Sequence, residues 1–274
     1  MGADGATAEI LVGGRSYRMV LPHAGTDYIQ KKLLAERQPY EREMLEDMGR
    51  RVEPDDLVVD IGANVGNHTM YLAAIAGCKV VAFEPNGQLC EAIAASAAEN
   101  ALADRIQIHN KALGAQRGRA RFATERPENL GAQRLALDDG GIEVVRLDDV
   151  ALPGPARVLK IDVEGMEDQV LAGAIGLLKR DRPLVYAECQ KEPDFRKVCR
   201  CLEAVDYGYW DTFNATPTHL FLPNEVVSAD QRVNRMLSML VSQQYKLGQH
   251  WLALKKLQPA RPAADSSGVP STRA

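Results

Sequence analysis

The chain has 274 residues, with 33 Lys and Arg against 37 Asp and Glu, and a formal net charge of -4. Hydrophobic residues make up 46 % and charged residues 26 %, a balance that is ordinary for a globular protein and excludes a disordered chain. The totals lack the basic excess typical of proteins that bind double-stranded nucleic acid, and no apolar run approaches the ~18 residues that span a membrane.

No apolar stretch preceded by basic residues opens the sequence, so we expect no signal peptide and a cytoplasmic protein. The five cysteines are scattered and odd in number, which does not indicate a disulfide framework. Cys199 and Cys201 form a CxC pair with no second Cys or His pair nearby, and this favours free thiols over a zinc site.

Residues 1–52 are expected to form a hairpin and helices that shape the acceptor pocket. Within 8–21, two short alternating runs flank Gly13-Gly14, a favoured two-residue turn. Residues 27–50 look helical, and Pro39 interrupts them, which predicts two helices.

Strands and helices alternate through the predicted catalytic domain, residues 53–226. Apolar runs predict buried strands at 57–61, 79–83, 105–109, 157–161 and 183–187. Helices are expected at 67–76, 86–100, 166–178 and 194–205, and an antiparallel strand pair at 210–213 and 219–222. Residues 114–147 are less regular, with β segments expected at 118–124 and 142–147. The alternation predicts an α/β fold with a parallel sheet, whose ligands bind beyond the carboxyl ends of the strands.

Residues 227–257 carry a different pattern, a 4-3 spacing of apolar residues typical of a coiled-coil seam. It predicts one amphipathic helix, which forms either a coiled-coil homo-oligomer or a cover on the domain's own surface; the oligomer is slightly favoured. Residues 258–274 are rich in Pro and Ser and are expected to be disordered. The seam positions are Val233, Leu237, Leu240, Gln244, Leu247, Trp251 and Leu254, with Gln244 a candidate for fixing the register.

A glycine loop, Asp60-Ile61-Gly62-Ala63-Asn64-Val65-Gly66, follows the first parallel strand. Glycines permit a sharp turn and a close ligand, and the next helix directs free N–H groups toward it. A dinucleotide site has the spacing GxGxxG, whereas here Asn64 replaces the second glycine and would crowd a pyrophosphate. The spacing therefore favours S-adenosylmethionine over NAD, with its carboxylate at the helix end and its ammonium group near Asp60.

Acidic residues end three further strands of the predicted sheet. Glu84 is placed to accept two hydrogen bonds from a ribose diol. Asp162 and Glu164 lie in Leu-Lys-Ile-Asp-Val-Glu-Gly, and Glu188 ends the next strand. Such carboxylates orient a methyl group, act as a general base or hold a metal ion, although acids at helix N-termini also arise for dipole reasons. No spacing defines a metal site, so magnesium remains an open alternative.

The blocks VVDIGANVGNHTMYLA, VVAFEP, RLDDV and LKIDVEGMEDQVLAGA, in this order over 57–190, resemble the FkbM-type methyltransferase family. The resemblance implies a class I methyltransferase fold, with a seven-stranded, mostly parallel sheet and the last strand antiparallel. It implies O-methyl transfer from S-adenosylmethionine to a sugar hydroxyl of a bacterial polysaccharide or glycoconjugate, or to a polyketide-type natural product. The cofactor-binding residues that we expect are Asp60, Gly62, Ala63, Asn64, Gly66, His68, Glu84, Pro85, Asn110, Ala112 and Asp162.

For the general base we rank Asp162 and Glu164 first, then His219, then Glu188. His219 closes a polar segment, 213–219, that resembles one in family members acting on bacterial glycans; a histidine simply bonded within a turn is the alternative. A function of another class also stays open, a non-catalytic protein whose C-terminal helix assembles a glycan-synthesis complex.

Overall fold

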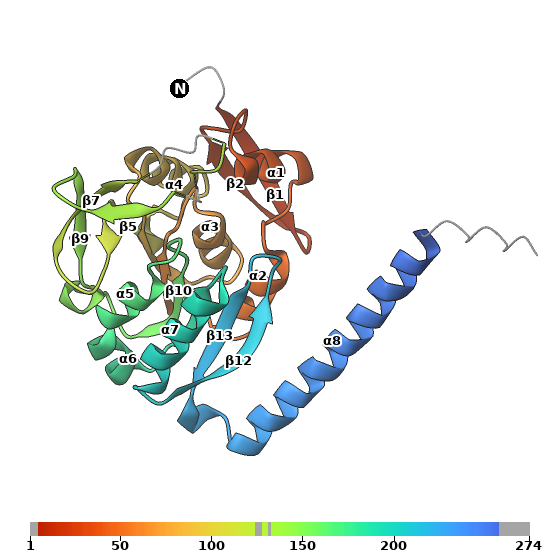
Figure 1. Ribbon diagram of the computed structural model, residues 1–274. Helices are drawn as coiled ribbons and strands as arrows, with labels where there is room; N and C mark the ends of the chain where they lie inside the picture. The colour runs from red at the N-terminus through yellow and green to blue at the C-terminus, as the bar shows by residue number, and fades with distance from the viewer. Residues whose placement is uncertain (1–4, 124–127, 131–132, 258–274) are drawn as a thin grey trace, which may run out of the picture. The chain divides into compact units, whose positions relative to one another are not determined.

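The computed structural model describes residues 5–123, 128–130 and 133–257 (Figure 1). Contacts divide the chain into two compact units, Met1–Ser228 and Ala229–Ala274. The predicted tail, 258–274, lies outside the described residues.

A seven-stranded sheet forms the centre of the first unit. Its strand order is β12-β13-β11-β10-β3-β4-β5, and every neighbouring pair from β11 to β5 is parallel. Strand β13 runs antiparallel to both of its neighbours. This confirms the predicted α/β fold, including the antiparallel last strand. The strands are β3 (Leu57–Ile61), β4 (Lys79–Phe83), β5 (Ile106–His109), β10 (Ala156–Ile161), β11 (Leu184–Glu188), β12 (Tyr207–Phe213) and β13 (Thr218–Pro223).

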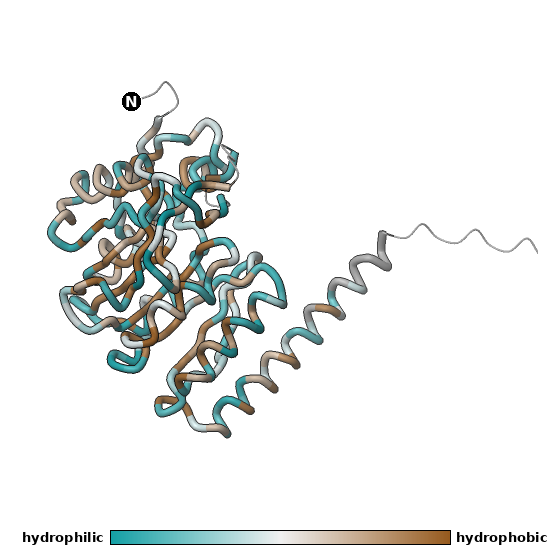
Figure 2. The backbone as a smooth tube through the Cα atoms, turned by 60° about the vertical axis from the view of Figure 1, so that its left-hand side comes forward, coloured by the Kyte–Doolittle hydropathy of each residue, from teal (hydrophilic) through white to brown (hydrophobic). Residues whose placement is uncertain are grey.

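Helices cover both faces of this sheet, as Figure 1 shows. Because successive side chains of a strand point to opposite faces, Val58 belongs to one core and Val59 to the other. The first core also contains α3 (Asn67–Ala74), α4 (Gly87–Glu99) and the N-terminal segment. The second contains α5 (Glu167–Ala172), α6 (Ile175–Asp181) and α7 (Glu192–Glu203). In Figure 2 the most hydrophobic stretches of this unit accordingly lie in its interior.

The N-terminal segment packs on α3 and α4 and shares the first core. It forms the predicted hairpin, β1 (Ala6–Val12) and β2 (Arg15–Leu21), and two helices, α1 (Tyr28–Glu36) and α2 (Arg42–Gly49). Gly13 and Gly14 both have positive φ, as the tight turn between paired strands requires. The Arg15 guanidinium donates hydrogen bonds to the carbonyls of Ala74 and Ile75 at the end of α3, and these bonds attach the hairpin to that helix.

The prediction of a single helix over 166–178 is wrong, because the structure has two helices there, α5 (Glu167–Ala172) and α6 (Ile175–Asp181). The Asp148 carboxylate accepts hydrogen bonds from the N–H groups of Gly176 and Leu177 and so caps a second helix start. A Cβ on Gly173 would lie 2.1 Å from the Gly114 carbonyl oxygen, so the break also admits a neighbouring backbone.

Residues 112–145 form a second, four-stranded sheet of order β6-β9-β7-β8. Two of its strands, β7 (Gly118–Phe122) and β9 (Ile142–Val145), correspond to predicted segments. The other two, β6 (Ala112–Leu113) and β8 (Leu135–Leu137), are too short for any periodicity to indicate them.

The described residues of the second unit form one long helix, α8 (Ala229–Leu257). Several large apolar side chains of α8 are exposed, among them Leu237, Leu240 and Leu247. No helix among the described residues is both long and apolar enough to cross a membrane.

Candidate active site

The carboxyl ends of β3, β4 and β10 meet at one edge of the central sheet. There the N–H groups of Gly62 and Ala63 donate to the Phe83 carbonyl, and the Asp162 N–H donates to the Ile61 carbonyl. The glycine loop and the acidic segment therefore lie side by side although about 100 residues separate them, as the parallel topology requires.

Both glycines of the loop have positive φ, +74° at Gly62 and +85° at Gly66. A Cβ on Gly62 would lie 1.8 Å from the Asp162 carbonyl oxygen, and one on Gly66 would lie 2.9 Å from Ile93. These glycines therefore allow other parts of the same chain to approach the loop closely. Their first role is to bring β3, β10 and α4 together.

Lys160 joins the two carboxylates at this edge and was not anticipated as a site residue. Its buried Nζ lies 3.1 Å from Asp60 Oδ1 and 3.5 Å from Asp162 Oδ2, and it donates to the Gly62 carbonyl at 2.9 Å. Burial works to lower the pKa of Lys160, but the charges of Asp60 and Asp162 outweigh it and leave the pKa above its usual value. One feature of the sequence could have indicated Lys160. It is a lysine within the apolar strand segment Leu159–Ile161, and a buried ammonium group requires a partner of opposite charge.

Asp60 itself is fully buried, and Thr69 donates a hydrogen bond to its second carboxylate oxygen at 2.7 Å. The structure thus places Asp60 behind the loop, where it anchors Lys160 and the start of α3.

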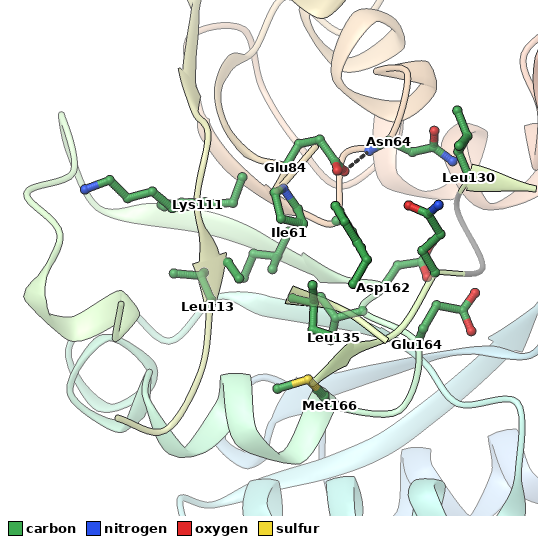
Figure 3. Close-up of a pocket in the computed structure, with 17 residues that line it drawn as sticks. Ile61, Asn64, Glu84, Lys111, Leu113, Leu130, Leu135, Asp162, Glu164 and Met166 are labelled. Carbon is green, nitrogen blue, oxygen red and sulfur yellow. Dashed lines mark hydrogen bonds between the residues drawn. The ribbon is translucent and has the colours of Figure 1, made fainter. Parts of the chain in front are cut away.

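Glu84 occupies the position expected for it, at the end of β4. Its carboxylate oxygens accept hydrogen bonds from the N–H group of Asn64 at 2.8 Å (Figure 3) and from that of Asn86 at 2.9 Å. Burial raises the pKa of Glu84 to about 7, although these two bonds work in the opposite direction. Asn110 lies behind it, where its amide donates to the Glu84 carbonyl oxygen at 2.9 Å.

Two pockets open at this edge. The first, of about 640 Å³, is mainly apolar and lies between the central sheet and the small one (Figure 3). Glu84, Asp162 and Glu164 supply its acidic groups. Its other predicted cofactor residues are Gly62, Asn64, Pro85 and Ala112, and its apolar walls include Leu113, Phe122, Leu130, Leu135 and Met166.

The second pocket, of about 820 Å³, is polar and shares Gly62, Asn64, Asp162 and Glu164 with the first. It is also lined by Ala63, His68, Lys160, Glu188 and Gln190, together with Tyr28, Tyr40 and Glu41 from the N-terminal segment. Asp162 and Glu164 thus stand at the junction of an apolar and a polar compartment.

The three carboxyl groups at this junction differ in protonation. Burial, and then the charge of Asp162, raise the pKa of Glu188 far above its usual value, so its O–H donates to Asp162. Burial opposes ionisation of Asp162, but Lys160 and this hydrogen bond leave its pKa below the usual value. Burial and the nearby charge of Asp162 raise the pKa of Glu164 to about 7, while Gln190 donates to its carboxylate at 2.9 Å.

The N-terminal segment contributes residues that no sequence motif indicated. Asn67 and Tyr40 form two hydrogen bonds, each 2.9 Å, between the Asn67 amide and the Tyr40 backbone. His68 Nε2 lies 3.0 Å from Glu41 Oε2, with both side chains largely buried. These contacts fix the N-terminal segment across the start of α3 and make it one wall of the polar pocket.

His219 is not among the residues that line either pocket. Its Nδ1 is 2.8 Å from Thr212 Oγ1, and its ring lies 4.4 Å from that of Phe195 beneath α7. Burial lowers the pKa of His219 to about 4, so its ring is neutral.

Cys199 and Cys201 lie in α7 as free thiols. Within the described residues, no three His, Cys, Asp or Glu side chains are grouped as ligands for a metal ion.

A family model described as the Methyltransferase FkbM domain matches residues 60–246, which is more than half of the chain. The chain belongs to the FkbM methyltransferase domain family. The resemblance seen over 57–190 is thereby confirmed, and the FkbM domain continues through β12 and β13 into α8.

Solved structures resemble this FkbM chain at low identity. Methyltransferase FkbM from Methylobacillus flagellatus KT is 20 % identical, with a TM-score of 0.51 over 73 % of this chain and 48 % of that chain. This chain therefore spans about half the length of that protein, and the similarity supports the fold. TYW2 of P. horikoshii, in complex with MeSAdo, has 15 % identity, a TM-score of 0.47, and coverage of 81 % and 71 %. No curated protein sequence matches the chain.

The residues at this edge fit S-adenosylmethionine. An apolar compartment with the Glu84 carboxylate at its wall suits a nucleoside. The carboxylates of Asp162 and Glu164 at the junction suit a sulfonium cation.

Proposed function

We propose that the chain is an S-adenosylmethionine-dependent O-methyltransferase acting on a sugar hydroxyl of a bacterial polysaccharide or glycoconjugate. The observation that carries the proposal is the pair Asp162 and Glu164, which stands where a mainly apolar pocket meets a polar one. A cytoplasmic location is part of the same proposal.

The cofactor would lie in the first pocket, held by Glu84, Pro85, Ala112 and the backbone around Gly62. When bound, S-adenosylmethionine supplies a methyl group on a positively charged sulfur. Asp162 is suited to face that charge, because its low pKa keeps it ionised.

Glu164 is suited to accept the proton of the acceptor hydroxyl on its carboxylate. A general base works best when its pKa is close to the working pH, and the pKa of Glu164 is about 7. Glu188 already holds a proton and donates a hydrogen bond to Asp162, so it serves to keep that carboxylate in place. Positioning of the two partners supplies much of the remaining rate.

The polar pocket supports a sugar as the acceptor. Tyr28 and Tyr40 offer aromatic surface, while Gln190, Glu41 and Glu164 offer planar groups that can bind neighbouring hydroxyls. A polyketide-type acceptor would meet few apolar walls on this side of the site.

Two measurements test the proposal. Calorimetry with S-adenosylhomocysteine should show binding, whereas NADH should not bind; the reverse result would refute the cofactor. Labelled S-adenosylmethionine should then transfer its methyl group to members of an oligosaccharide panel and not to polyketide alcohols. Tight cofactor binding without turnover on any hydroxyl would instead favour the non-catalytic assembly role.

A further inference from the structure

The long helix α8 carries an apolar face that the proposed enzyme function does not use. Every large apolar residue at its seam with a described side chain is more than half exposed. The members of this seam are Val233, Leu237, Leu240, Leu247 and Trp251, and Met236 and Val241 flank it, also at least 50 % exposed.

We propose that α8 pairs with α8 of a second copy of this chain, as a parallel, in-register coiled coil. In the heptad register, Val233, Leu240 and Leu247 take d positions and Leu237 takes an a position, an arrangement sustained over about three heptads. At ~1.5 Å per residue the 29-residue helix is about 43 Å long, so the whole seam can meet a partner.

The direction of pairing follows from Gln244, the fourth of the seven seam positions and an a position. A parallel pair places a positions opposite a positions, so each Gln244 amide meets the other and both find hydrogen-bond partners. An antiparallel pair places a opposite d and would bury Gln244 against Leu240 or Leu247. A buried amide without a hydrogen-bond partner is unfavourable, and this disfavours the antiparallel arrangement.

The residues beside the seam suit an identical partner. The e and g positions from 234 to 250 are Asn234, Met236, Val241, Gln243, Gly248 and His250, none of which is Asp, Glu, Lys or Arg. Two copies therefore meet without repulsion between like charges, and no charge pattern selects a different chain.

The apolar surface is also sufficient. Pairing would remove about 600 Å² of apolar surface per copy from solvent before other residues are counted, which is close to the ~800 Å² per partner of stable interfaces. This area counts roughly 100 Å² for each of six residues: Val233, Met236, Leu237, Leu240, Val241 and Leu247. A membrane surface is the competing occupant for such a face, but Gln244 at its centre would enter lipid without a partner.

Sedimentation equilibrium of the full chain tests the pairing. The wild type should have twice the mass of the 30.0 kDa chain at micromolar concentration. Leu240→Asp/Leu247→Asp should weaken the dimer at least ~100-fold, because four charges would enter the seam. Ser238→Asp/Ser242→Asp adds the same charges on the outer face and should leave the dimer intact. Calorimetry with S-adenosylhomocysteine checks that each variant is folded.

Cross-linking tests the direction. Under mild oxidation, Gln244→Cys should form a disulfide-linked dimer and Ser242→Cys, on the outer face, should not, with the wild type as the background for the native cysteines. A monomeric wild type, equal cross-linking of the two variants, or a monomer that binds anionic phosphatidylserine vesicles through Leu240 and Leu247 would each overturn the proposal.

Discussion

The protonation of Glu164 gives the sharpest test of the site. Burial and the charge of Asp162 raise its pKa from 4.5 to about 7. Because one pKa unit corresponds to 1.36 kcal/mol, charging Glu164 in the folded protein costs about 3 kcal/mol more than in water. The ionised share in the free enzyme then rises from about a tenth at pH ~6 to about nine tenths at pH ~8, so kcat/KM, which reports the free enzyme, should rise roughly tenfold over this interval.

Glu164→Gln removes the titrating group and keeps the shape and the contact with Gln190. We expect turnover to fall ~10²–10⁴-fold and the rise between pH ~6 and ~8 to disappear, while affinity for S-adenosylhomocysteine changes by less than about threefold. The matched control is Glu192→Gln, the same change at an exposed carboxylate of α7 that pairs with Arg196. A Glu164→Gln variant with turnover within twofold of wild type, or with the same pH profile, would refute the assignment.

Three other changes probe the parts of the site separately. Gly62→Ala should destabilise the fold by about 3 kcal/mol or more, because the new Cβ would overlap the Asp162 carbonyl; in thermal unfolding, Gly118→Ala, which meets nothing within 4 Å, is its control. Glu84→Gln should weaken S-adenosylhomocysteine binding roughly 10–100-fold in calorimetry, since its amide would face a backbone N–H donor; unchanged affinity would remove Glu84 from the cofactor site. Asp162→Asn should lower turnover by ~10²-fold or more in a chain that still folds, and near-normal rates would remove Asp162 from the reaction.

Much of this site could be predicted from the sequence because it depends on short apolar runs and on the residues that end them. The strand ends at Asp60, Glu84, Asp162 and Glu188 follow from short apolar runs, and a parallel sheet brings such ends to one edge. Knowing the edge, however, did not reveal which acids line its pockets. Asp60 is buried behind the loop because Lys160 and Thr69 hold it there, and Lys160 is far from it in sequence.

The parts that the sequence did not reveal depend on contacts between distant segments. Glu41 reaches the site through His68, and Tyr40 through Asn67, across the packing of α2 on α3. The break between α5 and α6 is set by Asp148, which lies 28 residues before the N–H group of Gly176 that it caps. Local periodicity cannot indicate such pairs, since the two residues become neighbours only when the chain has folded.

The charge distribution at the junction leads to a last prediction. Asp60 and Asp162 are held near one cation, Lys160, while Glu188 is kept neutral by a proton and Glu164 is only about half ionised at pH 7. A positive charge entering beside Glu164 should lower its pKa and release a proton, whereas an uncharged thioether should not. Calorimetry at pH ~7 in two buffers of different ionisation enthalpy should therefore detect release of up to about half a proton with S-adenosylmethionine and much less with S-adenosylhomocysteine. The Glu164→Gln variant should lose the difference between the two ligands. Equal proton release by both ligands would show that the positive charge binds away from this carboxylate.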